Sequence, residues 1–189
     1  MNWEAEFLLF LQEHIRCGFL TVIMKAFTYM GNYGILWYVL CIALTVNRKT
    51  RKLGIMCWAV LILNFLICNV LIKGNVGRTR PFEAIEDLTY LIGKPVDSSF
   101  PSGHTSSAFS LATVIALFVS RDKRWIGILS LVTAAMIGFS RLYLGVHYPT
   151  DVICGMILGI IFGISAYLLL NKKLDTLFNN ETNIETFES

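Results

Sequence analysis

A series of apolar runs constrains this sequence most, because several of them are long enough to cross a membrane as helices. A helix needs about twenty apolar residues to span the hydrocarbon core of a bilayer. Residues 26–46, 53–72 and 152–170 meet this length, and residues 105–120 and 125–140 form two shorter runs that their flanks can lengthen. The runs predict an all-α fold, a polytopic transmembrane helical bundle. Residues 17–29 lie along the interface or cross the membrane, so the count is five or six spans.

The composition fits this class and argues against others. Of 189 residues, 55% are hydrophobic and 15% are charged, whereas soluble domains average roughly 25% charged residues. A soluble globular enzyme, a disordered chain, a collagen and a coiled coil are therefore disfavoured. The formal net charge is +3, and the basic residues cluster between apolar runs instead of forming an exposed basic face. We therefore expect no nucleic-acid partner.

The N-terminal region differs from the apolar runs. Apolar and polar residues alternate there at helical spacing, which predicts an interfacial amphipathic helix region over residues 1–25. The apolar set is Phe7, Leu8, Phe10, Leu11 and Ile15, and the polar set is Glu4, Glu6, Gln12, Glu13 and Arg16. Residues 26–171 then form the transmembrane domain. Residues 172–189 are expected to form a polar cytoplasmic tail, disordered over residues 179–189.

The loop charges predict the orientation of the bundle. Lys and Arg gather in residues 48–52, 121–124 and 172–173, and short loops rich in these residues stay on the cytoplasmic side. The loops alternate correctly with the intervening spans. Residues 73–104 and 141–151 should therefore share the extracytoplasmic side of a cytoplasmic membrane.

Polar residues concentrate in three segments at the outer ends of predicted spans, residues 73–81, 101–104 and 140–151. Ionisable groups at such positions are costly unless they are paired or face a polar cavity. The candidate site residues in these segments are three cations, two imidazoles and one carboxylate: Lys73, Arg80, Arg141, His104, His147 and Asp151. This set suits a tetrahedral phosphate dianion, because Arg offers bidentate hydrogen bonds and Lys a mobile charge.

The two histidines have complementary candidate roles in phosphoryl transfer. His147 could attack phosphorus through a neutral ring nitrogen if its other nitrogen donates to Asp151. Because proline fits the first turn of a helix, Pro149 predicts that His147 precedes a helix and that Asp151 lies in its first turn. His104 would protonate the leaving oxygen.

The residues before His104 add a candidate phosphate-binding element. Ser102 and Gly103 precede it at the expected start of a helix, where backbone amides can hold an anion. Gly103 permits close approach and Ser102 offers a hydroxyl donor. Lys73, Arg80 and Arg141 would close around the remaining phosphate oxygens.

The three segments resemble the signature motifs of the type 2 phosphatidic acid phosphatase superfamily of membrane lipid phosphatases. The pattern K-x6-RP is met by Lys73, Arg80 and Pro81, PSGH by residues 101–104, and SR-x5-H-x3-D by Ser140, Arg141, His147 and Asp151. The resemblance covers residues from about 53 to 170. It implies that His147 is transiently phosphorylated, that His104 is the general acid, and that neither a metal ion nor another cofactor is required.

The resemblance leaves the substrate open among lipid phosphates. Undecaprenyl diphosphate is favoured, with phosphatidate or phosphatidylglycerophosphate next, and the chain is expected to act as a monomer or weak homodimer. One alternative is a lipid phosphotransferase, in which an acceptor hydroxyl intercepts the phosphohistidine. Another is a non-catalytic protein that binds or translocates a lipid headgroup.

Several other residues have structural interpretations. Arg78 and Lys94 have no motif role and are interpreted as cations that attract anionic headgroups. Asn64 and Asn69 are expected to form hydrogen bonds between helices. Gly155, Gly159 and Gly163 repeat at every fourth residue, which indicates close helix packing inside the bundle and, less strongly, a dimer interface.

Overall fold

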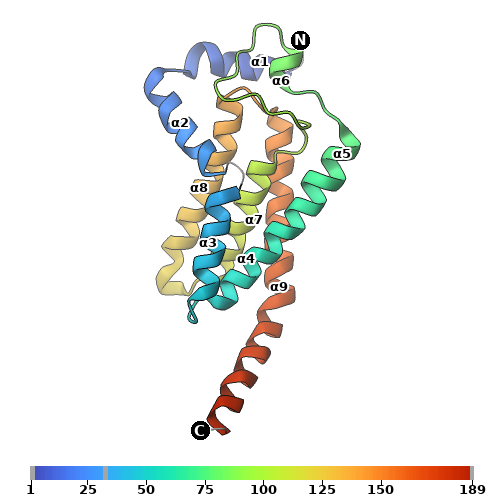
Figure 1. Ribbon diagram of the computed structural model, residues 1–189. Helices are drawn as coiled ribbons and strands as arrows, with labels where there is room; N and C mark the ends of the chain where they lie inside the picture. The colour runs from blue at the N-terminus through green and yellow to red at the C-terminus, as the bar shows by residue number, and fades with distance from the viewer. Residues whose placement is uncertain (1–2, 32–33, 188–189) are drawn as a thin grey trace.

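The computed structural model describes residues 3–31 and 34–187, and within these ranges it contains helices and connecting loops but no strand (Figure 1). The predicted all-α fold is therefore confirmed. The main helices are α1 (Trp3–Phe10), α2 (Gly18–Met30), α3 (Ile35–Val46), α4 (Arg51–Asn64), α7 (Gly103–Phe118), α8 (Arg124–Tyr143) and α9 (Pro149–Phe187). The shorter elements are η1 (Leu11–Ile15), η3 (Phe65–Ile72), α5 (Lys73–Val76), α6 (Pro81–Ala84) and η4 (Arg121–Lys123).

Helix α7 forms the centre of the bundle and packs against α4, α8 and α9. Its buried residues are mostly small, which lets neighbouring helices approach closely. On the α9 side, a Cβ atom added to Gly155 would lie 2.7 Å from the carbonyl oxygen of Ser102, and one added to Gly163 would lie 2.6 Å from Cβ of Thr113. The glycine repeat is therefore used for packing within the bundle, as predicted, and not for a dimer interface.

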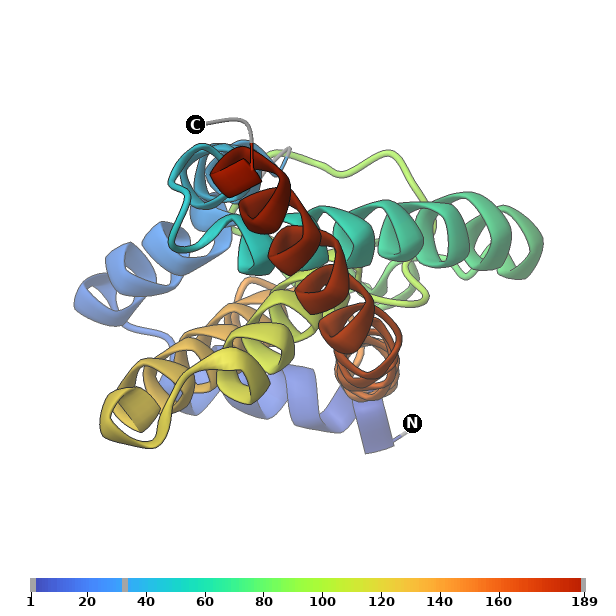
Figure 2. The same cartoon turned by 90° about the horizontal axis from the view of Figure 1, so that it is seen from below.

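Helix α4 continues through η3 into α5 and leans away from the bundle. Figures 1 and 2 show α5 standing apart from α7 and α9. The contact between this helix and α7 includes a hydrogen bond from the Ser106 hydroxyl to the Asn64 amide oxygen, which confirms the predicted interhelical role of Asn64.

In the part of the chain that the structure describes, three helical segments are long and apolar enough to cross a membrane: Arg51–Ala84, Arg121–Tyr143 and Pro149–Phe178. Helices α2 and α3 would together form a fourth span. This span is broken, because the axes of the two helices differ by 53°. The apolar run 26–46 is thus not one straight helix. Residues 32–33 of that run lie outside the described residues, and Gly34 has a left-handed φ of +67°, which breaks the helix. Helix α7 is apolar but shorter, and five or six crossings remain a prediction.

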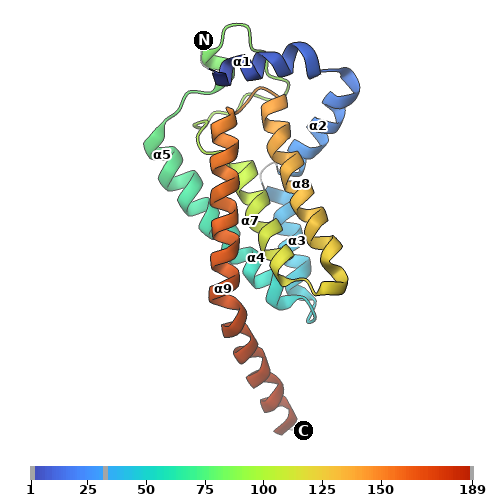
Figure 3. The same cartoon turned by 180° about the vertical axis from the view of Figure 1, so that it is seen from behind.

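The basic loops lie together at one end of the bundle, as predicted. The α3–α4 and α7–α8 connections lie at one end, and α9 leaves the bundle at that same end (Figures 1 and 3). These are the three basic regions. The loop between α6 and α7, the end of α8 and the start of α9 lie at the opposite end.

Helix α1 lies across this opposite end of the bundle (Figures 1 and 3). Phe7 and Phe10 are exposed, whereas Leu8 and Leu11 are buried. Glu4 belongs to the polar set of the predicted amphipathic helix, yet it is only 4% exposed. A carboxylate can be buried in this way only with partners, and these belong to the site described next.

The C-terminal region also differs from expectation. Helix α9 continues to Phe187, so residues 179–187 are helical and not disordered. Once a helix exists, adding polar residues to its end avoids the cost of nucleation. Residues 188–189 of the predicted tail lie outside the described residues.

Candidate active site

The three motif segments meet at the end of the bundle that α1 covers. His104 lies in the first turn of α7, Arg141 in the last turn of α8, and Asp151 in the first turn of α9. His147 lies two residues before the start of α9, as the position of Pro149 predicted. Arg141 exerts the largest electrostatic effect on His104 among its neighbours, followed by His147, Lys73 and Arg80. Six residues predicted from separate segments are therefore neighbours in space.

Two local features place the loop between α8 and α9. Gly145 has a φ of +75°, a left-handed conformation that favours glycine and turns the chain back after α8. A Cβ atom there would lie 2.7 Å from the carbonyl oxygen of Thr89. The turn leads directly to His147, which is 1% exposed. His147 is thus held within the protein and away from bulk water.

His147 and Asp151 form a buried pair. Nδ1 of His147 lies 3.4 Å from Oδ2 of Asp151, and the same oxygen accepts hydrogen bonds from the Ser99 hydroxyl at 2.5 Å and from the Tyr148 amide at 2.8 Å. Burial lowers the pKa of His147 to about 3, although Asp151 opposes the shift. The ring is therefore neutral at physiological pH, and a proton on Nδ1 facing the carboxylate leaves the lone pair on Nε2.

Ser102 and Gly103 connect α7 to this pair. The Ser102 hydroxyl caps α7 by accepting from the Thr105 amide at 3.4 Å, and the Ser102 amide donates to the Asp151 carbonyl oxygen at 3.0 Å. Gly103 lies under the side chain of Asn69, whose oxygen would be 2.8 Å from an added Cβ atom. These contacts fix the start of α7 beside the start of α9.

Arg80 and Lys73 share a carboxylate that the sequence analysis did not identify. Arg80 donates through Nη2 to Oδ1 of Asp97 at 2.6 Å and through Nε to the Asp97 carbonyl oxygen at 2.8 Å, and Lys73 forms an ion pair with Oδ2. Burial alone would raise the pKa of Asp97, but Lys73 and Arg80 outweigh it and lower the pKa below its ordinary value. Nη1 of Arg80 lies 3.4 Å from Nε2 of His147.

Arg141 is the third predicted cation, and it has an unused donor. Nη1 donates to the Thr28 hydroxyl of α2, whereas the Nε–H group has no hydrogen-bond partner among the described residues. Arg141 is 2% exposed. Leaving a buried donor unsatisfied costs about 1–3 kcal/mol or more for a charged group. The free donor beside two histidines is suited to an anionic ligand.

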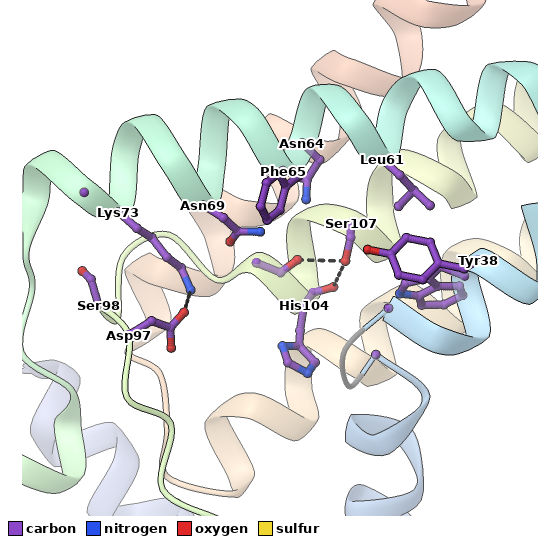
Figure 4. A pocket seen from close by; sticks show the side chains of 15 residues that line it. Tyr38, Leu61, Asn64, Phe65, Asn69, Lys73, Asp97, Ser98, His104 and Ser107 are labelled. Atoms are coloured by element: carbon purple, nitrogen blue, oxygen red, sulfur yellow. Dashed lines mark hydrogen bonds and ion pairs between the residues drawn. The ribbon is translucent and has the colours of Figure 1, made fainter.

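A cavity of about 650 Å³ opens beside the site between α3, η3 and α7 (Figure 4). Lys73, Asp97 and His104 lie at one end of it, and Trp37 and Phe65 are among the apolar residues along its wall. The His104 ring packs over Gly31, where an added Cβ atom would lie 2.6 Å from the ring. The cavity therefore combines a charged end with an apolar wall.

Several residues of the site were missed by sequence reasoning. Asp97 and Ser99 precede the PSGH segment directly, so their position was a signal that could have been used. Arg78 was interpreted as a cation for headgroups, and this was wrong, since it donates to Asp151 at 2.6 Å. Glu4 and Thr28 carry no sequence signal, because their partners lie far away along the chain.

Comparison with known proteins agrees with this geometry. Residues 52–175 match the PAP2 superfamily. An undecaprenyl-diphosphatase of Sulfolobus acidocaldarius is 34% identical over 136 residues, which are 69% of this chain and 63% of that protein. The chain thus spans less than two thirds of that relative.

Two solved structures resemble the fold. A transmembrane PAP2 type phosphatidylglycerolphosphate phosphatase from Bacillus subtilis aligns with a TM-score of 0.76 and 28% identity, over 89% of this chain and 85% of that one. Aquifex aeolicus LpxE aligns with a TM-score of 0.73 and 30% identity, over 88% of this chain and 95% of that one. The helical bundle, the three motif segments and these matches show that the chain belongs to the PAP2 superfamily.

Proposed function

We propose that this protein hydrolyses a phosphate ester or anhydride bond of a lipid, without a metal ion, through a phosphohistidine on His147. The main support for the proposal is the position of the His147 ring between a carboxylate and a guanidinium. Nδ1 lies 3.4 Å from the Asp151 carboxylate, and Nε2 lies 3.4 Å from the Arg80 guanidinium. A neutral imidazole with its lone pair beside a cation can attack a phosphorus atom bound by that cation.

In the first step, Nε2 of His147 forms a bond to phosphorus while the bond from phosphorus to the leaving oxygen breaks. His104 gives a proton to that oxygen. Asp151 stabilises the positive charge that develops on the His147 ring. Lys73, Arg80 and Arg141 neutralise the non-bridging oxygens. The Gly103 amide at the start of α7 adds a donor, whereas the Ser102 amide is already bonded to the Asp151 carbonyl oxygen. The dephosphorylated lipid then leaves.

In the second step, the now neutral His104 removes a proton from water, and the resulting hydroxide attacks phosphorus. The bond between phosphorus and Nε2 breaks, inorganic phosphate is released, and His147 returns to its neutral form. Each histidine therefore ends the cycle in the protonation state in which it began. The same intermediate would pass to an acceptor hydroxyl in a transferase, and product analysis distinguishes the two outcomes.

A lipid is the substrate class that fits the surroundings of the site. The cavity leads from Lys73 and His104 along Trp37, Leu61 and Phe65, which gives a phosphate group a polar end and an acyl or prenyl chain an apolar wall. We favour undecaprenyl diphosphate, followed by phosphatidate or phosphatidylglycerophosphate. The similarity to an undecaprenyl-diphosphatase and to a phosphatidylglycerolphosphate phosphatase supports both choices.

The position of the basic loops supports a location in the cytoplasmic membrane with the site facing the extracytoplasmic side. All three basic regions lie at the end of the bundle opposite His104 and His147. Residues 26–171 would form the phosphatase domain. A cysteine introduced at Glu86, in a Cys17→Ser background because Cys17 is itself exposed, should react with an impermeant reagent added to intact cells, and labelling only after lysis would contradict this orientation.

The activity can be tested by measuring phosphate release from purified lipid phosphates and diphosphates in detergent with excess chelator. We expect release by the wild type and by His14→Ala, because His14 is exposed on η1. We expect none by His147→Ala. Binding without turnover by the wild type would favour a headgroup-binding protein, and a requirement for a divalent ion would contradict the metal-free mechanism.

A further inference from the structure

The N-terminal helix contributes a buried carboxylate to the surroundings of Asp151. Glu4 on α1 is 4% exposed, whereas Glu6 on the same helix is exposed. Both oxygens of Glu4 are used: Oε2 accepts from Nη2 of Arg78 at 2.6 Å, and Oε1 accepts from the Thr150 hydroxyl at 2.6 Å and the Thr150 amide at 3.1 Å. Glu4 is therefore tied both to Arg78 and to the first turn of α9.

Arg78 bridges two carboxylates. Its Nη1 donates to Oδ1 of Asp151 at 2.6 Å and to the Thr150 hydroxyl at 2.7 Å, while Nη2 donates to Glu4. The flat guanidinium lies over the Tyr148 ring, 4.0 Å from its centroid. These contacts fix the orientation of the guanidinium, so that only one of its terminal nitrogens faces Asp151.

Arg78 divides its hydrogen bonds between two carboxylates, and this affects which oxygen of Asp151 faces His147. An arginine left alone with a carboxylate prefers to contact both carboxylate oxygens with two parallel hydrogen bonds. With Nη2 held by Glu4, Arg78 contacts only Oδ1 of Asp151. Oδ2 is then left to Ser99, to the Tyr148 amide and to Nδ1 of His147. The carboxylate orientation that serves His147 is thus the one found with the second terminal nitrogen of Arg78 bonded to Glu4.

We propose that Glu4 and Arg78 are positioning residues of the active site: Glu4 restrains Arg78 so that Asp151 presents its second oxygen to His147. This inference rests on the proposed phosphohistidine mechanism. It makes α1 part of the catalytic apparatus, although the three motif segments do not include it. The opposite face of α1 carries the exposed side chains of Trp3, Phe7 and Phe10, so the same helix connects the lipid interface to the catalytic pair.

Removal of the Glu4 charge should leave the fold intact, because α1 and η1 have other attachments. Leu8 and Leu11 are buried. The Gln12 side chain donates to the Asp87 carbonyl oxygen at 2.8 Å, and Nε of Arg16 donates to the Tyr143 carbonyl oxygen at 2.9 Å. Glu4→Gln also retains the size of the side chain.

The test compares Glu4→Gln with Glu6→Gln, a matched control on the exposed face of the same helix. With a lipid phosphate as substrate, we expect Glu4→Gln to lower kcat about tenfold or more, as for other residues that orient a functional histidine, and to leave KM within about twofold. Glu6→Gln should match the wild type. Adding Glu4→Gln to Arg78→Gln should cause a smaller further loss than Glu4→Gln causes alone, since the Arg78 contact is already gone and only the Thr150 hydrogen bonds of Glu4 remain to be changed.

A second measurement does not depend on turnover. Nitrogen-15 NMR of the histidine rings reports which nitrogen of His147 carries the proton, and a His147→Gln spectrum assigns the signal. We expect the wild type to carry it on Nδ1 and Glu4→Gln to shift toward a mixture of tautomers. Equal kcat values for Glu4→Gln and Glu6→Gln with unchanged His147 signals would overturn the inference. A wild type that releases no phosphate from any lipid would instead contradict the proposed function, and the NMR comparison would still decide the role of Glu4.

Discussion

Asp97 accepts a 2.6 Å hydrogen bond from Arg80, so the arginine that we propose binds phosphate already holds a carboxylate. Lys73 pairs with the same carboxylate. Asp97 is half exposed, whereas Arg80 is almost fully buried. The carboxylate is therefore the more exposed member of the pair, and in the proposed mechanism it competes with a phosphate group for the same cations.

We predict that Asp97→Asn strengthens phosphate binding. Loss of the competing charge should lower the inhibition constant of inorganic phosphate about tenfold, a change of about 1.4 kcal/mol. The measurement is phosphate inhibition of lipid phosphate hydrolysis. Glu83→Gln is the control, because Glu83 pairs with Lys94 at 2.8 Å on the surface. Weaker phosphate binding by Asp97→Asn would mean that Asp97 instead holds Lys73 and Arg80 in place.

The buried state of His147 predicts how stability depends on pH. Burial lowers its pKa from 6.5 to about 3. Between these values the unfolded chain binds a proton that the folded chain does not, so the free energy of unfolding falls as the pH is lowered through this range. Thermal unfolding in detergent should be measured from about pH 7 to pH 4. Over this range the unfolding midpoint should fall less for His147→Gln than for the wild type. Parallel losses in both proteins would contradict a neutral, buried imidazole.

Thr28 should matter for catalysis although it lies on α2, outside the motif segments. It is fully buried and accepts from Nη1 of Arg141. Thr28→Val keeps the shape and removes the acceptor, which leaves a second unsatisfied donor on Arg141. We expect kcat/KM to fall about tenfold, equivalent to about 1.4 kcal/mol of transition-state stabilisation.

Thr133→Val provides the control for this prediction. The Thr133 hydroxyl donates to the Leu129 carbonyl oxygen on the outer side of α8, away from Arg141. Its kcat/KM should equal that of the wild type. A Thr28→Val variant as active as Thr133→Val would show that Arg141 needs no orientation from α2.

The packing of α7 on α9 should be sensitive to single methyl groups. A Cβ atom at Gly159 would lie 2.5 Å from the carbonyl oxygen of Ser106, and backbone cannot move aside as a side chain can. Gly159→Ala should therefore destabilise the fold by about 1–3 kcal/mol. Its unfolding midpoint should fall by several degrees, whereas Gly18→Ala, with nothing within 4 Å of the added atom, should not lower it. Equal midpoints would contradict the close packing.

Sequence reasoning succeeded where a local pattern has one physical meaning. Apolar run length indicated membrane helices, loop charges indicated which connections share an end, and Pro149 placed His147 before α9. The spacing of Gly155 and Gly159 indicated helix packing because small residues recur on one helix face. The motif segments could be assigned to one end of the bundle from these patterns together.

The remaining features depend on contacts between distant parts of the chain. In an amphipathic pattern, Glu4 is expected to be an outward-facing charge. Its burial follows only from its pairing with Arg78 across the fold. Asp97 lies in a long loop without periodicity, so its pairing with Lys73 has no local signature. The bend between α2 and α3 was hidden because the apolar run continues through it, and hydropathy does not report backbone direction.

The central claim is that His147 forms a bond to phosphorus. Rapid quenching of the enzyme during turnover of a lipid phosphate labelled with phosphorus-32, under alkaline conditions that preserve phosphohistidine, tests it most directly. We expect label on the peptide containing His147, and none after His147→Gln. Label on another residue, or turnover by the wild type with no labelled protein at any quench time, would contradict it.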